Sequence, residues 1–426
     1  MPITIAQDTN VDHSRSLQHN LEARIDEYLQ KVSPNGDHIL HGLLPNRGAI
    51  QLISNDYLCL SGEPALIAAQ VNFLQGAEAK ENIMSAVFLH GPNSTQDFER
   101  KMAHYLQSED GVVCQSGYSA NVGLLQALAL PQTPVYLDFK AHASLWDGVT
   151  AAGAKACVFM HNDLDDLRRE IAKNGPGIIC VDSVYSTTGS VCPVVELVEI
   201  AEQSGSILIV DESHSIGTHG PHGAGIVVEH GLQERVHYRT FSLAKAFAGR
   251  GGFVTCSSRF KGYFSCHSRH AIFSSCLLGA ELAYFSAAID FLIGADDRRQ
   301  RLMQNARRLR GGLSALGYNV ATGTEQIIAL EPGELAKTRI LRDALQEHQV
   351  FGAVFYGPAT ADKRTIVRLT VNSGLADAQI DRVVDVCSQI RERVNMAEWR
   401  STKRQFQVPR HASTPAAKVE DLALVC

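Results

Sequence analysis

The chain has 426 residues, a formal net charge of −6 at pH 7 and 45% hydrophobic residues. This length predicts two to three domains and is ample for a sizeable core. The acidic balance provides no basic field, so we expect no nucleic-acid and no membrane partner. The 10 cysteines are scattered without a C-x-x-C pair, and several lie in apolar runs, which indicates a cytoplasmic location.

Both ends of the chain have polar sequences. Residues 1–18 contain no apolar core of a signal peptide or membrane anchor, and we predict that they are disordered. Leu21 to Val32 has helical spacing, and we expect residues 19–62 to form an N-terminal helix and a segment that joins a small domain. The composition turns polar and basic at the other end, which predicts a disordered tail over residues 398–426.

Short apolar runs, polar loops and helical stretches alternate through the middle of the chain. The runs begin near Val113, Val135, Ile178, Ile207 and Arg239. This alternation predicts an α/β fold with a mostly parallel sheet covered by helices, in a large domain over residues 63–290.

A smaller α+β domain is predicted over residues 291–397. A long helical pattern from Ala280 to Leu316 leads into it. The pattern then indicates strands at Gln326 to Leu330 and Ile366 to Val371, followed by an amphipathic helix from Asp377 to Val394.

The most informative stretch begins at Ile207. The apolar run from Ile207 to Val210 is typical of a buried strand, and it ends in Asp211-Glu212-Ser213-His214. Ligands gather beyond the carboxyl ends of such strands. Lys245 follows in a mostly apolar stretch before a flexible, glycine-rich segment, and desolvating its ammonium is costly unless the charge is paired or neutralised.

One chemistry uses Asp211, His214 and Lys245 together. A neutral lysine forms a Schiff base with pyridoxal 5'-phosphate (PLP), a carboxylate keeps the pyridine nitrogen protonated, and a histidine binds the phenolic oxygen. Taken singly, each residue has an ordinary explanation as a helix cap, a loop histidine or a lysine beside glycine. The combination D-E-x-H with S-x-x-K, however, resembles the α-oxoamine synthases, PLP enzymes of fold type I that condense an acyl-CoA with an amino acid.

The resemblance spans roughly residues 45–395 and implies a catalytic set of Lys245, Asp211, His214 and His142. His142 lies in an H-A-S motif whose histidine stacks on the PLP ring in the family. Arg368 matches the arginine that binds the carboxylate of the amino acid in the family. Without the resemblance, His142 would be interpreted as an ordinary loop histidine and Arg368 as a surface residue of a strand. The further PLP-binding residues implied by the resemblance are Ser116, Gly117, Tyr118, Ser186, Ser242 and Ser275.

The resemblance adds details to each of these roles. Ser116 to Tyr118 belong to an S-G-x-x-A-N segment that cradles the phosphate, although Ser116 could simply be an N-cap. Ser275 matches a hydroxyl that reaches the phosphate in the neighbouring subunit, which implies a homodimer with shared active sites. One departure is Gly357, where related enzymes often carry an arginine.

Within the family the chain is most similar to the quorum-sensing autoinducer synthases of the CqsA/LqsA type. Met84, Phe88 and Leu89 replace a glycine-rich segment of biosynthetic members, which implies a medium- or long-chain acyl-CoA unless these side chains are simply core. The implied product is an α-aminoketone, the precursor of an α-hydroxyketone autoinducer.

Several alternatives stay open from the sequence. They are a synthase of the 8-amino-7-oxononanoate or 2-amino-3-ketobutyrate type, a PLP aminotransferase or carbon–sulfur lyase, and a non-catalytic binding protein. A dehydrogenase is disfavoured because Gly220-x-x-Gly223-x-Gly225 lacks the dinucleotide-binding spacing. We predict no metal site, because Cys266, His267 and His270 are crowded together without a second ligand pair.

Overall fold

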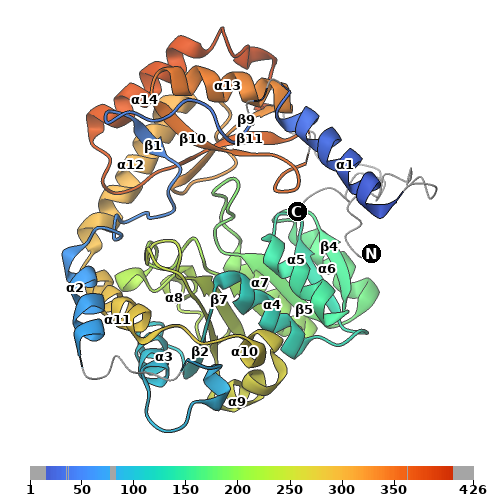
Figure 1. The fold of residues 1–426 in the computed structure, drawn as a ribbon. Coiled ribbons are helices and arrows are strands. Elements are labelled where there is room, and N and C mark those ends of the chain that lie inside the picture. The colour runs from blue at the N-terminus through green and yellow to red at the C-terminus, as the bar shows by residue number, and fades with distance from the viewer. Residues whose placement is uncertain (1–15, 35, 37, 77–82, 362, 406–426) are drawn as a thin grey trace.

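The computed structural model describes residues 16–34, 36, 38–76, 83–361 and 363–405. Two sheets, each with its own helices, lie one above the other (Figure 1). The larger sheet has seven strands in the order β2-β8-β7-β6-β5-β3-β4. Only β8 in this sheet is antiparallel to its neighbours, which confirms the predicted mostly parallel α/β fold. The strands are β2 (Asp110–Cys114), β3 (Pro134–Asp138), β4 (Lys155–Phe159), β5 (Ile178–Asp182), β6 (Ile207–Asp211), β7 (Tyr238–Ser242) and β8 (Gly252–Cys256).

Side chains of the central strands enter two apolar clusters on opposite faces of the large sheet. Ile178 and Cys180 of β5 belong to one cluster, while Ile179 and Val181 belong to the other. This division follows from the alternation of side chains along a strand, and burial on both faces explains why β5 and β6 are continuously apolar. Register pairs Asp182 with Asp211, so these strands deliver two carboxylates to one edge of the sheet.

Helices cover both faces of the large sheet. The first cluster includes side chains of α4 (Gly117–Leu128), α5 (Ala143–Ala152) and α9 (Ser258–His267). The second includes side chains of α2 (Pro64–Gln75), α3 (Ser94–Tyr105), α6 (Leu164–Asn174), α7 (Val194–Ser204), α8 (Ile226–Glu229) and α11 (Gly279–Ile293). The short helices η2 (Ala86–Phe88), η3 (Pro221–Gly223) and α10 (Arg269–Phe273) lie in the connections.

The small domain is built on a four-stranded sheet in the order β1-β10-β11-β9. Its strands are β1 (Ile50–Leu52), β9 (Ile327–Gly333), β10 (Val350–Phe355) and β11 (Thr365–Thr370), and its helices are α12 (Asp296–Ala315), α13 (Leu335–Glu347) and α14 (Asp377–Ile390). Because β1 pairs in parallel with β10, the chain starts in this sheet before it enters the large domain.

The predicted helical pattern from Ala280 to Leu316 is two helices in the structure. Helix α11 ends before Gly294, and α12 starts again at Asp296 and extends into the small domain (Figure 1). The two acidic residues in the first turn of α12 favour a helix start here, because they face the positive end of the helix dipole. Gly294, followed by Asp296 and Asp297, therefore explains why the helical pattern is divided into two helices.

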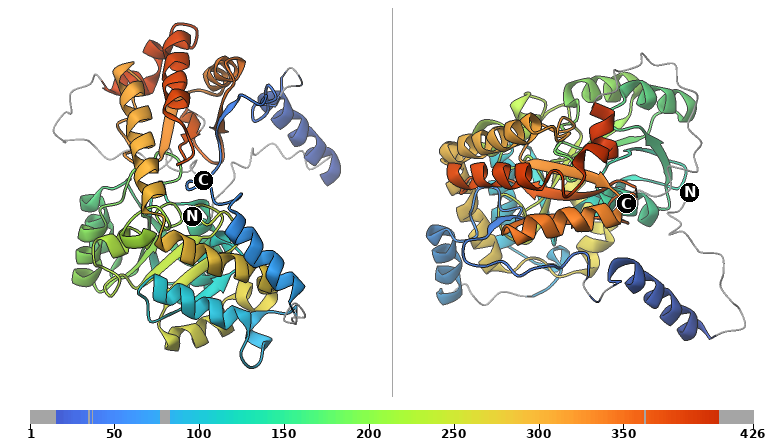
Figure 2. Two further views of the ribbon diagram at one scale, coloured as in Figure 1. Left: turned by 90° about the vertical axis from the view of Figure 1, so that its left-hand side faces the viewer. Right: turned by 90° about the horizontal axis from the view of Figure 1, so that it is seen from above.

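The described parts of both termini are helical. Helix α1 (Leu17–Val32) is capped by Ser16, so residues 16–18 of the expected disordered N-terminus belong to a helix. It projects from the body in Figures 1 and 2. At the other end, η4 (Met396–Glu398) and α15 (Arg400–Gln405) replace the start of the expected disordered tail, because Trp399 is buried and anchors them. Residues 1–15 and 406–426 lie outside the described residues.

None of the described helices is both long and apolar enough to cross a membrane.

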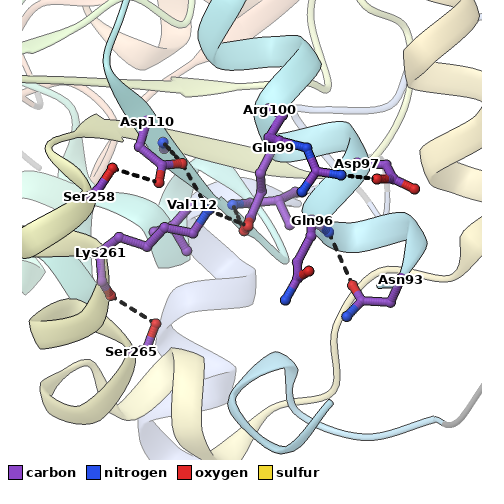
Figure 3. Close-up of polar contacts among 12 residues, drawn as sticks. Asn93, Gln96, Asp97, Glu99, Arg100, Asp110, Val112, Ser258, Lys261 and Ser265 are labelled. Carbon is purple, nitrogen blue, oxygen red and sulfur yellow. Dashed lines mark hydrogen bonds and ion pairs between the residues drawn. The ribbon is translucent and has the colours of Figure 1, made fainter. Parts of the chain in front are cut away.

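An ionic cluster anchors edge strand β2 to the helices beside it (Figure 3). Lys261 Nζ lies 2.8 Å from both Glu99 Oε2 and Asp110 Oδ1. Glu99 Oε1 also accepts the backbone N–H of Val113 at 2.9 Å. Burial raises the pKa of Glu99, and the neighbouring ammonium of Lys261 opposes this effect. Through Glu99 the cluster therefore binds the Val113 N–H, one of the backbone groups that β2 presents at this edge.

A second, more deeply buried ion pair joins β6 to β7. Arg239 Nε lies 2.5 Å from Glu212 Oε2, and the two side chains are 2% and 0% exposed. The guanidinium also donates to the carbonyl groups of Leu106 and Ala224. Glu212 Oε1 accepts the backbone N–H of Val227 at 3.0 Å. Every charge in this pair therefore has partners that replace water.

We expect Arg239→Met to destabilise the protein by about 3–5 kcal/mol, because it leaves the Glu212 carboxylate buried without its counterion. Thermal unfolding monitored by circular dichroism measures the effect. Arg235→Met is the matched control, since Arg235 pairs with Glu202 at the surface and its loss should leave the melting temperature nearly unchanged. Equal melting temperatures for the two variants would contradict a special role for the buried pair.

Candidate active site

A cavity of about 170 Å³ lies at the carboxyl edge of the large sheet. The structure brings most of the predicted site residues together around it, whereas Ser186, Ser275 and Arg368 lie outside its lining. The lining residues are Ser116, Gly117, Tyr118, His142, Ser144, Asp182, Asp211, Ser213, His214, Ser242 and Lys245.

The carboxylate of Asp211 is held from two sides. Its Oδ2 accepts the amide of Asn121 at 2.7 Å, and its Oδ1 accepts the backbone N–H of Ser213 at 2.8 Å. Asn121 is 1% exposed, and its own oxygen accepts the hydroxyl of Thr240 at 2.5 Å. These bonds fix the orientation of the Asp211 side chain at the cavity wall.

The ring of His142 is held in one tautomer. Its Nδ1 accepts the backbone N–H of Ser144 at 3.3 Å and lies 2.8 Å from the Ser144 hydroxyl. That hydroxyl in turn accepts from Asn121 at 2.8 Å, so its own proton is free to point at His142. Burial lowers the pKa of His142, with partial opposition from Asp211. The neutral ring therefore carries its proton on Nε2.

His214 binds a tyrosine from a distant part of the chain. Its Nδ1 lies 2.5 Å from the hydroxyl of Tyr57, which is fully buried. The side chain of Gln326 donates to the backbone carbonyl of His214 at 2.8 Å. Burial, followed by the charges of Lys245 and Arg368, lowers the pKa of His214 well below its usual value. His214 is therefore neutral, with Nε2 left for the cavity.

Lys245 lies in a closed turn after β7. Its carbonyl accepts the backbone N–H of Ala248 at 2.8 Å, and Gly249 N–H donates to Leu243 at 3.0 Å. A Cβ at Gly249 would lie 2.4 Å from the ring of Phe285, so the glycine allows this ring to pack closely against the turn. Burial, followed by the charge of Arg368, lowers the pKa of Lys245, which favours the neutral amine.

The N-terminus of α4 also lines the cavity. The first turn of a helix leaves backbone N–H groups without intrahelical partners, and Gly117 and Tyr118 provide them here. Gly117 is packed so closely that a Cβ would lie 2.6 Å from Ser242 Cβ. Ser116 is an N-cap, as the alternative interpretation had it, and it lines the cavity as well. This tight backbone cradle fits a phosphate group.

These observations fit PLP. One cavity is lined by a lysine with a lowered pKa, a carboxylate held by hydrogen bonds, two neutral histidines and the N-terminus of a helix. No three His, Cys, Asp or Glu side chains of the described part of the chain are grouped to hold a metal ion. His267 instead stacks on Tyr263, with the ring centroids 3.8 Å apart.

Arg368 and Ser186 lie beside the cavity and bind one another. Arg368 is 5% exposed, and its guanidinium donates to the Ser186 carbonyl at 2.9 Å and to Asn55 Oδ1 at 3.1 Å. It also lies 4.5 Å above the ring of Phe355. Arg368 is therefore buried, and the alternative interpretation as a surface residue of a strand is wrong.

Ser275 and the segment from Met84 to Leu89 lie apart from the cavity. Ser275 is exposed, and its carbonyl accepts the side chain of Gln115 at 3.0 Å. Met84 and Phe88 are 45% and 52% exposed. In the single subunit, therefore, these residues are neither core nor part of the cavity lining.

Several site residues were missed by the sequence analysis. Asn121 belongs to the S-G-x-x-A-N segment, and Asn55 and Tyr57 belong to a Ser54-Asn55-Asp56-Tyr57-Leu58 stretch, so a motif was present for all three.

Asp182 was also missed. It ends β5 beside Asp211 and accepts the backbone N–H of His142 at 3.2 Å. Burial, followed by the charge of Asp211, raises the pKa of Asp182 well above its usual value. Its position at a strand end was the available signal.

The chain was compared with known proteins. A family described as aminotransferase class I and II matches residues 47–386. The CAI-1 autoinducer synthase of Vibrio campbellii is 40% identical over 88% of this chain and 96% of that protein. The 8-amino-7-oxononanoate synthase of Exiguobacterium sibiricum is 30% identical over 82% of this chain and 90% of that protein.

A solved structure supports the same assignment. The serine palmitoyltransferase of S. paucimobilis with bound PLP-myriocin aldimine superposes with a TM-score of 0.81 at 25% identity, over 89% of this chain and 100% of that one. Because the family match covers most of the chain and extends to relatives along nearly their whole length, the chain belongs to the aminotransferase class I and II family, as a PLP-dependent α-oxoamine synthase.

Proposed function

We propose that the protein condenses a medium- or long-chain acyl-CoA with an amino acid, with loss of CO₂, to give an α-aminoketone precursor of an α-hydroxyketone autoinducer. The observation that carries this proposal is the similarity to the CAI-1 autoinducer synthase over nearly the whole chain, together with the convergence of Lys245, Asp211, His142 and His214 on one cavity. Both substrates are proposals, as is the cytoplasmic location with which the free cysteines of the described ranges agree.

The chemistry needs a base for the α-proton of the amino acid. PLP, when bound, supplies an electron sink that stabilises negative charge at the α-carbon. Lys245 is the proposed anchor and base, since its lowered pKa favours the neutral amine that accepts a proton. Asp211 is the proposed partner of the pyridine nitrogen, because it lines the cavity and its two hydrogen bonds hold its side chain in place. His142 is the proposed ring-stacking residue.

The phosphate is proposed to bind at the start of α4, where Ser116, Gly117 and Tyr118 line the cavity beside Ser242. The helix dipole and free N–H groups favour an anion there. The amino acid carboxylate is proposed to bind Arg368, whose planar guanidinium suits a bidentate carboxylate. Ser186 would then lie between Arg368 and the phenolic oxygen.

Tyr57 is a proposed positioning residue for His214. Burial raises the pKa of Tyr57 well above its usual value, so the hydroxyl keeps its proton. If that proton is donated to His214 Nδ1, the ring carries its own proton on Nε2, where it can be donated to the phenolic oxygen of PLP. Tyr57 thus determines which way the histidine donates.

The enzyme is proposed to work as a homodimer with shared sites. Two hydrogen bonds join the η2 region to the segment around Ser275: Ser85 Oγ donates to Ile272 O at 2.7 Å, and Cys276 N–H donates to Met84 O at 3.0 Å. The exposed apolar side chains of these two segments therefore lie close together. Contiguous exposed apolar surface typically marks an interaction site. The exposed hydrophobic residues are Ile83, Met84, Val87, Phe88, Phe273 and Leu278.

A second candidate is an α-oxoamine synthase of primary metabolism. The similarity to 8-amino-7-oxononanoate synthases and serine palmitoyltransferases, at 27–30% identity, favours it. It shares every proposed role with the autoinducer precursor synthase and differs only in its substrates, so the acyl donor and the amino acid decide between them.

Release of free CoA thiol tests the proposed reaction. We expect release from decanoyl-CoA only when an amino acid is also present, with at least tenfold higher kcat/KM for decanoyl-CoA than for acetyl-CoA, because about 0.8 kcal/mol is gained for each buried methylene. Lys245→Ala should abolish turnover while the fold is retained. Preference for acetyl-CoA would favour the second candidate, and turnover by Lys245→Ala would contradict the role of the lysine.

Tyr57→Phe tests the positioning of His214. We expect kcat to fall about tenfold, the scale of one lost hydrogen bond to a partly charged group. The pH midpoint of the visible absorbance change of bound PLP should rise, because a donor to the phenolic oxygen is weakened. Tyr356→Phe is the matched control, since that hydroxyl binds Tyr28 at the surface. An unchanged midpoint in Tyr57→Phe would refute the positioning role.

Mixed variants test the shared active sites. Hybrid dimers of Lys245→Ala with Ser275→Asp contain one site in which both residues are intact, so mixing two inactive proteins should restore up to about a quarter of the wild-type activity by random pairing of subunits. Mixing Lys245→Ala with Asp211→Asn is the control, because each variant damages the site of its own subunit. If neither mixture recovers activity, Ser275 does not act across the interface.

A further inference from the structure

A second cavity of about 180 Å³ lies between the carboxyl edge of the large sheet and the small domain. Segments that follow β3 and β5 form one wall, and β9 to β11 with their connecting loop form the other. The lining residues are Phe139, Lys140, Ala141, His142, Ala143, Ser186, Thr187, Thr188, Glu331, Phe355, Ala359, Thr360, Ala361, Arg364 and Ile366.

The lining selects an apolar occupant. Two phenylalanines, four alanines and one isoleucine make up seven of the fifteen lining residues, and three threonines add their methyl groups. The charges at the rim already have partners, because Arg364 Nε lies 3.2 Å from Glu331 Oε1 and Lys140 has a polar partner of its own. An apolar cavity of this kind holds water poorly and gains free energy when a hydrocarbon fills it.

The second cavity adjoins the place where the proposed reaction occurs. His142 lines both cavities. Ser186 lines the second cavity and binds Arg368 through its carbonyl, while Phe355 lies directly below the Arg368 guanidinium. A chain attached to a carbon held between His142 and Arg368 can therefore enter the apolar space directly.

The segment from Met84 to Leu89 borders a different cavity, of about 150 Å³, through Ala86 and Val87. That cavity shares no lining residue with the candidate active site, and its wall includes the charged Glu99 and Lys261. Met84 and Phe88 are about half exposed and line none of the three cavities. Their backbone is instead fixed to the segment from Ile272 to Cys276. The apolar enclosure nearest to the reacting groups is thus the one between the two domains.

We propose that this second cavity binds the alkyl chain of the acyl substrate and that Ala143 and Phe139 determine the accepted chain length. The inference rests on the proposed function, since it assumes an acyl donor. Ala143 occupies the first turn of α5 directly after His142, so a larger side chain there shortens the space next to the reacting atoms. Phe139 follows β3, and its truncation enlarges the same space.

The experiment measures kcat/KM with acetyl-, hexanoyl-, octanoyl-, decanoyl- and dodecanoyl-CoA. The amino acid in these assays is the one among glycine, alanine, serine, threonine and 2-aminobutyrate that gives the highest rate with wild type. Each variant is also assayed with all five amino acids and decanoyl-CoA. Ala143→Leu and Phe139→Ala are compared with Ala151→Leu, a matched control on the exposed face of α5, and with Phe88→Ala, which tests the competing chain position at η2.

We expect Ala143→Leu to move the optimum to shorter chains and Phe139→Ala to longer ones. About fourfold in kcat/KM is expected per methylene gained or lost, which corresponds to about 0.8 kcal/mol at 1.36 kcal/mol per tenfold. Ala151→Leu should keep the wild-type profile, and Phe88→Ala should leave the optimum chain length unchanged.

Three results would overturn the inference. The first is an unchanged chain-length profile in both cavity variants. The second is a shift in Phe88→Ala alone, which places the chain at η2. The third is a change across the amino-acid series without a change across the acyl series, which places the amino-acid side chain in the cavity. If wild type releases no CoA with any donor, the proposed function itself fails, a result distinct from these three.

Discussion

The buried ion pair between Arg239 and Glu212 holds together the two strands that carry the candidate catalytic groups. Glu212 lies between Asp211 and His214 in the chain, yet it does not line the cavity that Asp211, Ser213 and His214 share. Its side chain instead points to Arg239 of β7, the strand that leads to Lys245. Burying two charges costs about as much as their attraction returns, so the pair contributes orientation more than net stability. Without this constraint, the turn after β6 could present the wrong residues to the cavity.

Around the cavity, burial favours neutral forms over charged ones. The pKa values of His142, His214 and Lys245 are lowered, and that of Asp182 is raised. The hydrogen bonds that the two histidine rings can offer to the cavity are therefore directed by Ser144 and Tyr57. No arginine lines this cavity in the described ranges. A phosphate would then depend on the helix N-terminus and serine hydroxyl groups, so the cationic charge of Arg368 stays available for a carboxylate.

The local parts of this structure were predictable from sequence, and the non-local parts were not. Strands β5 and β6 are continuous apolar runs that end in aspartate. Such runs predict buried strands of a parallel sheet, and the end of β6 predicts the position of Asp211. Strand β10 was missed because Gly352 and Ala353 interrupt its pattern, and β4 was missed because Lys155 and Ala156 make it only partly apolar. Tyr57 and Gln326 reach His214 from far along the chain, and neither residue type alone indicates such a contact.

Several contacts between the two domains involve residues of the candidate active site. Gln326, which adjoins β9, and Tyr57, which follows β1, both bind His214, while Arg368 of β11 binds Ser186. The loop before β9 is also packed against the segment after β5, since a Cβ at Gly323 would lie 2.0 Å from the Thr188 carbonyl oxygen. A shift of the small domain would thus change the donor to His214, the position of Arg368 and the width of the apolar cavity together. Because these three features depend on one alignment, a movement of Arg368 with the small domain would also change the width of the space beside His142, where we propose that the acyl chain binds.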